Sequence, residues 1–257
     1  MKKLARSALH AIGFDIVRYR PPSDPVSLLP IYPLDLSVED RAILERVAGY
    51  TLTSIEMQVA LVQAVRYLVQ RGIDGCFVEC GVWRGGSSMA AALTLAQEGE
   101  TNRDLYLYDT FEGMTPPTAV DRTADGTLAQ TYLDRDVNKE TVYWCVAGID
   151  DARQNMALTG YPEERVHFVK GPVETTIPKH SPNGTVALLR LDTDWYESTK
   201  HELIHLFPLL REGGVLIIDD YGHWAGARKA VDEYFGGLTR KFYMQRIDYS
   251  GRLLVKL

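Results

Sequence analysis

Residues 76–88 read CFVECGVWRGGSS. The first five are mostly apolar and form a run short enough for a buried strand, and three glycines follow within the next six positions. Glycine permits a tight turn and the close approach of a ligand, and a helix that starts after such a turn presents unpaired N–H groups. These residues therefore predict a strand, a ligand-binding turn and a helix, with a purely structural turn as the alternative.

The turn differs from the two common phosphate-binding motifs. Trp83 stands where G-x-G-x-x-G has its second glycine, and the Gly-Lys-Ser/Thr of a P-loop is missing. Glu79 would repel a phosphate group, whereas it suits an ammonium or sulfonium group. We therefore expect a small ligand that carries a positive charge.

Three further apolar runs also end on acidic residues. They are residues 105–109, 186–192 and 215–220. Short apolar runs separated by helical patterns indicate buried parallel strands, and ligands bind at the carboxyl ends of such strands. The acids are therefore expected to meet at one edge of a sheet, where a cation would offset their repulsion.

The pattern along the chain is that of an α/β protein. Strands are expected near 76–80, 105–109, 165–169, 186–192 and 214–219, and helices near 37–49, 53–71, 86–98, 137–158, 196–210 and 224–236. Thr53 and Glu56 resemble a capping box at the start of the second helix. Residues 241–247 and 252–257 resemble a closing hairpin. We predict a doubly wound, mostly parallel seven-stranded sheet with a C-terminal antiparallel hairpin.

Two parts are predicted along the chain. Residues 51–257 form the α/β domain, and residues 1–50 form a helical extension. Within the extension we expect a short amphipathic helix at 1–19 and a connector with five prolines at 20–33. This extension is also where we expect contact with a second copy, in a homodimer or a higher homo-oligomer.

Composition and charge exclude several classes of function. A net charge of -6, with no run of Lys or Arg, disfavours nucleic-acid binding. No stretch reaches the ~20 apolar residues of a membrane span. The three cysteines include no metal-binding Cys-x-x-Cys pair, so we interpret them as reduced thiols of a cytoplasmic protein.

Two groups of acids suggest specific ligands. Asp109 ends the second predicted strand, where an acid in nucleoside-binding α/β folds accepts hydrogen bonds from ribose hydroxyls; the alternative is a cap on the next turn.

Asp192 and the pair Asp219-Asp220 end strands expected ~4.8 Å apart, so they could share one ion. An all-oxygen site suits Mg²⁺, Mn²⁺ or Ca²⁺ rather than zinc. Asp192 or Asp194 could then accept a proton from a chelated hydroxyl; helix capping is the alternative.

A zinc-protease motif also occurs. Residues 201–205 read HELIH and match H-E-x-x-H, but Pro208 and Arg211 occupy the glycine and third histidine positions of the extended motif. We expect Ile204 on the buried face of this helix and Glu202 on its solvent face. The α/β alternation already explains the helix, so the protease interpretation is disfavoured.

Four motifs together resemble a known family. They are VECGVWRGGS (78–87), YDTFEGM (108–114), RLDTDWYEST (190–199) and GGVLIIDDY (213–221). In this order they resemble the Mg²⁺- and S-adenosylmethionine-dependent O-methyltransferases of the macrocin O-methyltransferase type. The resemblance implies a class I methyltransferase fold and methyl transfer to a hydroxyl of a sugar or aromatic small molecule.

The resemblance also implies roles for individual residues. The cofactor-binding residues would be Glu79, Gly81, Val82, Trp83, Ser87, Asp109, Thr110 and Gly171. The metal ligands would be Asp192, Asp219 and Asp220, with Asp192 also the catalytic base. Residues 110–136 are expected to form a lid, or else a surface loop. Two rivals stay open: a hydroxylase-like relative, and a non-catalytic domain that binds the same cofactor.

Overall fold

The computed structural model describes residues 32–136, 138–139, 143–177 and 179–257. Residues from Leu36 onward form one compact unit. The predicted amphipathic helix at 1–19 and most of the proline-rich connector lie outside the described residues. Within the described ranges, no helix is both long enough and apolar enough to cross a membrane.

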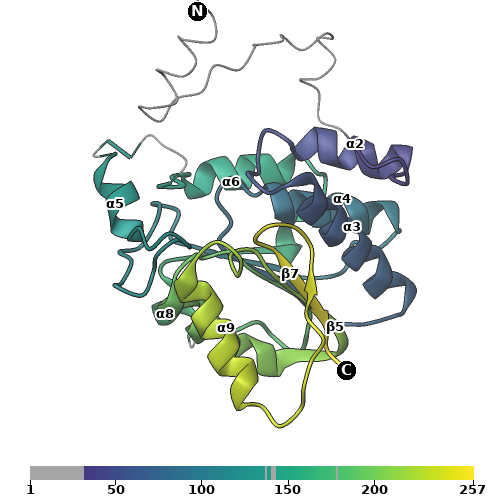
Figure 1. Ribbon diagram of the computed structural model, residues 1–257. Coiled ribbons are helices and arrows are strands. Elements are labelled where there is room, and N and C mark those ends of the chain that lie inside the picture. Colours follow the sequence, from purple (N-terminus) through teal and green to yellow (C-terminus); the bar gives the residue numbers. More distant parts are fainter. Residues whose placement is uncertain (1–31, 137, 140–142, 178) are drawn as a thin grey trace, which may run out of the picture. The chain divides into compact units, whose positions relative to one another are not determined.

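A seven-stranded sheet forms the centre of this unit (Figure 1). Its strands are β1 (Cys76–Cys80), β2 (Leu105–Asp109), β3 (Val166–Lys170), β4 (Val186–Leu191), β5 (Leu210–Ile218), β6 (Gln245–Arg246) and β7 (Arg252–Val255). The order is β3-β2-β1-β4-β5-β7-β6, and β1 to β5 are parallel. β7 is antiparallel to both β5 and β6. The predicted sheet and its closing hairpin are confirmed.

Helices cover both faces of the sheet (Figure 1). One group packs together and consists of α2 (Val38–Val47), α3 (Ile55–Gln70), α4 (Gly86–Gln97) and α6 (Ile149–Ala157). The other consists of α7 (Val173–Thr176), α8 (Tyr196–Leu206) and α9 (Ala225–Gly237). The strand order reverses between β1 and β4, and α/β folds bind ligands in the crevice at such a switch point.

The helix predicted at 137–158 was wrong for the described residues that precede α6, which are 138–139 and 143–148. Only residues 149–157 form α6, and Gly148 is its N-cap. Upstream, the Trp144 indole donates hydrogen bonds to the carbonyl oxygens of Leu133 and Asp136. These contacts fold this stretch back onto the short helix α5 (Ala129–Asp134), and a tertiary contact of this kind overrides local helix propensity.

The capping residue of α3 also differs from the prediction by one position. The N-cap is Ser54, whose hydroxyl accepts a hydrogen bond from the Met57 amide at 3.1 Å. The hydroxyl also donates to Asp248 Oδ2 at 2.5 Å, in the turn between β6 and β7. Thr53 is therefore not the cap, and its hydroxyl lies beside that of Thr51 instead.

We predict that Ser54→Ala destabilises the fold more than Ser37→Ala does. Each serine caps a helix, and loss of a cap costs about 1 kcal/mol. Only Ser54 also donates to a carboxylate, so its loss should cost about 2–3 kcal/mol in total. Urea unfolding of the two variants measures the difference, and equal losses would contradict a role for the Ser54–Asp248 bond.

Candidate active site

A cavity of ≈ 440 Å³ opens at the carboxyl ends of the central strands. Every residue that the sequence analysis assigned to the cofactor or the metal lines it: Glu79, Gly81, Val82, Trp83, Ser87, Asp109, Thr110, Gly171, Asp192, Asp219 and Asp220. These residues come from distant parts of the chain, and the order of the strands brings them together. Their individual roles stay predictions.

The glycine turn is fixed from two sides. Gly81 has a φ of 83°, and a Cβ atom there would lie 1.8 Å from the carbonyl oxygen of Asp192, so only glycine permits this approach. Asp109 Oδ2 accepts hydrogen bonds from the amides of Val82 at 2.6 Å and Trp83 at 2.9 Å. Asp109 therefore holds the turn against the end of β2.

Asp109 keeps some capacity for a ligand. Its Oδ1 accepts a third backbone hydrogen bond, from Phe111 at 2.6 Å. A carboxylate offers about four acceptor positions. The strand-end cap considered from the sequence is therefore present. The Thr110 hydroxyl lies 3.4 Å from Oδ1 and donates at 2.6 Å to the carbonyl oxygen of Gly113, so a ligand hydroxyl would compete at Asp109 only with this long contact.

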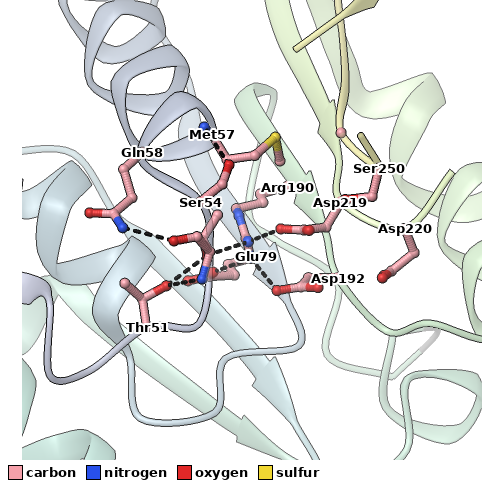
Figure 2. Close-up of polar contacts among 12 residues, drawn as sticks. Thr51, Ser54, Met57, Gln58, Glu79, Arg190, Asp192, Asp219, Asp220 and Ser250 are labelled. Atoms are coloured by element: carbon pink, nitrogen blue, oxygen red, sulfur yellow. Dashed lines mark hydrogen bonds and ion pairs between the residues drawn. The ribbon is translucent and has the colours of Figure 1, made fainter. Parts of the chain in front are cut away.

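Arg190 is the functional residue that the sequence analysis missed. It is only 3% exposed, and Figure 2 shows its guanidinium among three acids. Nη1 donates to Glu79 Oε1 at 2.8 Å and to Asp192 Oδ2 at 2.7 Å, and Nη2 donates to Asp219 Oδ2. Nη2 also contacts Thr53 Oγ1 at 3.2 Å. The sequence did contain a signal for this role, because Arg190 is the single charged residue within an apolar strand. A charge buried in a strand requires partners of opposite charge nearby.

The acids of the cavity exceed the charge that Arg190 can balance. Burial raises the pKa of Glu79 to about 7, although Arg190 opposes this rise. Burial also raises the pKa of Asp194 to about 7, and raises those of Asp219 and Asp220 well above the ordinary value. Neighbouring carboxylates add to each of the last three shifts. The site is therefore suited to a further cation.

Three carboxylates are close enough to hold one ion. One oxygen from each of Asp192, Asp194 and Asp220 lies within 4.8 Å of the other two. Within the described ranges, no other group of three or more acidic, histidine or cysteine side chains is arranged in this way. Two of the predicted ligands belong to this group, while the third, Asp219, is bonded to Arg190.

The wall beside these acids is aromatic. Trp195 and Trp224 pack edge to face with ring centroids 5.1 Å apart, and both line the cavity. The Trp195 indole donates to the carbonyl oxygen of Thr115 at 2.9 Å, within the segment predicted to be a lid. In the same segment, the fully buried Asp121 accepts a hydrogen bond from the Tyr196 amide at 2.8 Å. The segment therefore covers the site, and its opening as a lid stays a prediction.

The faces expected for Glu202 and Ile204 of α8 were wrong. Glu202 is fully buried, whereas Ile204 is 47% exposed. The Thr193 hydroxyl donates to Glu202 Oε1 at 2.9 Å, and this bond offsets part of the cost of burying the acid. The buried positions 199, 202, 203 and 206 follow helical spacing. The buried face of α8 could therefore have been predicted from the sequence by allowing an acid among its residues.

Comparison with known proteins identifies relatives that share one activity. The sequence model of the family described as Macrocin-O-methyltransferase (TylF) matches residues 39–255. The 8-demethyl-8-(2,3-dimethoxy-alpha-L-rhamnosyl)-tetracenomycin-C 4'-O-methyltransferase of Streptomyces olivaceus is 34% identical over 204 residues, covering 79% of this chain and 74% of that protein. The demethyldecarbamoylnovobiocin O-methyltransferase of Streptomyces niveus is 30% identical over 186 residues, covering 72% of this chain and 68% of that protein.

The fold is likewise similar to solved structures. The structure of the O-methyltransferase NovP aligns with a TM-score of 0.70 at 27% identity, covering 80% of this chain and 82% of that chain. The class I methyltransferase fold expected from the sequence is confirmed by this likeness.

We predict that Arg190→Met destabilises the fold by about 3–5 kcal/mol, because it leaves buried carboxylates without a counter-charge. Arg190 opposes the raised pKa values of Glu79 and Asp219, so loss of the guanidinium raises both further. An acid with a raised native pKa costs stability as the pH increases, so the deficit should be larger at pH 8 than at pH 5.

Urea unfolding at the two pH values measures this effect. Arg84→Met serves as the control, because the Arg84–Asp151 pair is partly exposed and should be worth about 1 kcal/mol or less. A loss of similar size in both variants would contradict the role assigned to Arg190.

Proposed function

This chain belongs to the macrocin O-methyltransferase family. From that premise we propose that it transfers a methyl group from S-adenosylmethionine to a hydroxyl of a sugar or aromatic small molecule. We propose further that Mg²⁺ or Mn²⁺ assists this transfer. The relatives that act on a rhamnosyl tetracenomycin and on a novobiocin precursor support this class of acceptor. The proposal rests on one observation. The glycine turn, Asp109 and the carboxylates that follow β4 and β5 all line the same cavity.

The residues on the β1–β2 side fit S-adenosylmethionine. Glu79, Gly81, Val82, Trp83 and Ser87 would surround its methionine part, with Ser87 in the first turn of α4. On the same wall, Asp109 and Thr110 would bind its ribose, and Gly171 would lie at its adenine. When bound, the cofactor supplies an electrophilic methyl group on a positively charged sulfur. The excess of carboxylates in the cavity favours such a charge.

The residues on the β4–β5 side fit a divalent ion. The donors are carboxylate oxygens only, which suits Mg²⁺ or Mn²⁺. We propose Asp192, Asp219 and Asp220 as ligands, because all three end neighbouring strands and line the cavity. When bound, the ion lowers the pKa of a chelated hydroxyl. Arg190 holds one oxygen of Asp192 and one of Asp219 in place.

Asp192 and Asp194 are the candidates for the base. Asp192 is one of the proposed ligands of the ion, and one of its oxygens already accepts a hydrogen bond from Arg190. Asp194 lies in the same carboxylate group, and burial raises its pKa to about 7, near the value that suits general-base catalysis. We therefore assign proton acceptance to Asp194 and ion binding to Asp192.

The aromatic wall completes the proposed site. Trp195 and Trp224 present apolar surface next to the carboxylates. Such a wall packs against the acceptor, excludes water, and orients the nucleophilic oxygen toward the methyl group.

We predict that EDTA abolishes methyl transfer and that added Mg²⁺ restores it. Asp192→Asn should weaken Mg²⁺ binding and reduce turnover about 100-fold or more, because several kcal/mol of charge stabilisation are lost. Asp194→Asn should reduce turnover while it weakens Mg²⁺ binding less than Asp192→Asn does, because Asp194 is assigned to the proton and not to the ion.

The assay follows an isotopically labelled methyl group from S-adenosylmethionine into glycosylated aromatic acceptors, and calorimetry measures Mg²⁺ binding. Asp150→Asn, an exposed acid on α6, is the control. Full turnover in excess EDTA would exclude the metal role, and cofactor binding without turnover on any acceptor would favour a binding domain.

We also predict that Mg²⁺ raises the melting temperature more at pH 8 than at pH 6. In the metal-free fold the pKa values of the proposed ligands Asp219 and Asp220 are raised well above the ordinary value, mainly by burial, so the folded protein retains protons that the unfolded chain has lost and stability falls as the pH rises above the ordinary range of a carboxyl group. At pH 6 protons compete with the ion, whereas at pH 8 the ion binds ionised carboxylates. Thermal unfolding with and without Mg²⁺ tests this, and equal shifts at both pH values would contradict it.

A further inference from the structure

Glu202 is a buried acid that the proposed chemistry does not use. It is fully buried in α8, and its Oε2 has no hydrogen-bond partner among the described residues. An ionised carboxylate in such a place would be costly. Its Oε1 accepts the hydroxyl of Thr193 at 2.9 Å, and the carboxyl group also interacts with the buried Cys80 thiol at the end of β1.

Thr193 stands between two residues of the carboxylate group. Asp192 precedes it and Asp194 follows it, and both line the cavity. Asp194 has a φ of 64°, a left-handed conformation that a non-glycine residue keeps only where the surrounding structure holds it. The backbone of this turn therefore needs external support.

Helix α8 supplies that support from one side. Ser198 Oγ donates to the carbonyl oxygens of Thr193 at 3.3 Å and Trp195 at 3.1 Å. Glu202 lies one helical turn further along and holds the side chain of Thr193. From the β5 side, Asp220 Oδ2 accepts the amide of Asp194 at 3.2 Å. The turn is thus clamped between α8 and the end of β5.

We propose that Glu202 is a positioning residue, which acts through Thr193 to hold Asp192 and Asp194 in the geometry that binds the ion and accepts the proton. The inference rests on the proposed metal-assisted function. It assigns a role to the acid of the H-E-x-x-H sequence that is unrelated to zinc, since neither histidine belongs to a three-ligand group within the described ranges.

The surroundings of Glu202 favour its neutral form. Burial raises its pKa well above the ordinary value, and the acids Glu174, Asp192 and Asp220 add to this shift. The neighbouring Cys80 thiol is buried, and its pKa is also raised. A neutral carboxyl group keeps the acceptor that Thr193 needs without adding a negative charge behind the metal site.

This neutrality makes glutamine the matched replacement. Glu202→Gln keeps the size and the acceptor oxygen, so Mg²⁺ affinity should stay within about threefold of the unchanged protein. Glu202→Ala and Thr193→Val should each weaken Mg²⁺ binding about 10–100-fold, the effect typical of losing an outer contact of a metal ligand. The double variant should lose no more than either single variant, because both remove the same hydrogen bond.

The test titrates Mg²⁺ alone into each metal-free protein by calorimetry and then titrates S-adenosylmethionine. In Thr193→Val cofactor affinity should fall less than Mg²⁺ affinity, because Asp109 and the glycine turn make their hydrogen bonds with each other and not with Thr193. Thr193→Val replaces a hydroxyl with a methyl group of similar size. It therefore still tests the Thr193–Glu202 hydrogen bond if Glu202→Ala fails to fold. His205→Gln, at an exposed position of the same helix, is the control.

Three outcomes would overturn the inference. The first is Mg²⁺ affinity equal to that of the unchanged protein in both Thr193→Val and Glu202→Ala. The second is a loss in Glu202→Gln as large as in Glu202→Ala. The third is the absence of Mg²⁺ binding to the unchanged protein, which would reject the proposed metal site itself and is distinguishable from the other two.

Discussion

The structure depends on one buried guanidinium placed among the acids that end three neighbouring strands. Arg190 is bonded to Glu79 from β1, to Asp192 after β4 and to Asp219 after β5. Without it, the parallel sheet would bring like charges together in a region of low dielectric. The same contacts fix the side chains in space, so that the interaction which permits the fold also shapes the cavity.

The switch point of the sheet divides the cavity into two sides. The glycine turn and Asp109 lie on the β1–β2 side, and the carboxylate group lies on the β4–β5 side. Gly81 brings the sides together, because its missing side chain lets the end of β1 approach the backbone of Asp192. In the function proposed here, the methyl donor and the acceptor would therefore lie on adjacent sides of one cavity.

Helix α8 illustrates how burial changes the meaning of a motif. As a linear sequence, residues 201–205 match a zinc-protease helix. In the fold, Glu202 faces inward beneath the turn that carries Asp192 and Asp194, while His205 is exposed. A five-residue pattern does not specify which face of a helix is buried, and the chemistry of its acid depends on that face.

The sequence by itself determined the class of fold, the convergence of acids at one edge and several of the residues that line the cavity. Apolar runs that end on Glu79, Asp109, Asp192 and Asp219 carry this information, because parallel strands present their carboxyl ends at the same edge.

Only the tertiary structure decided that Arg190 is shared by three acids, that Asp194 joins Asp192 and Asp220, and that residues 143–147 are not helical. These features depend on side chains from distant segments and on strand register, for example the pairing of Glu79 with Arg190. Local propensity and spacing along the chain do not encode such contacts, since they arise only when the sheet is assembled.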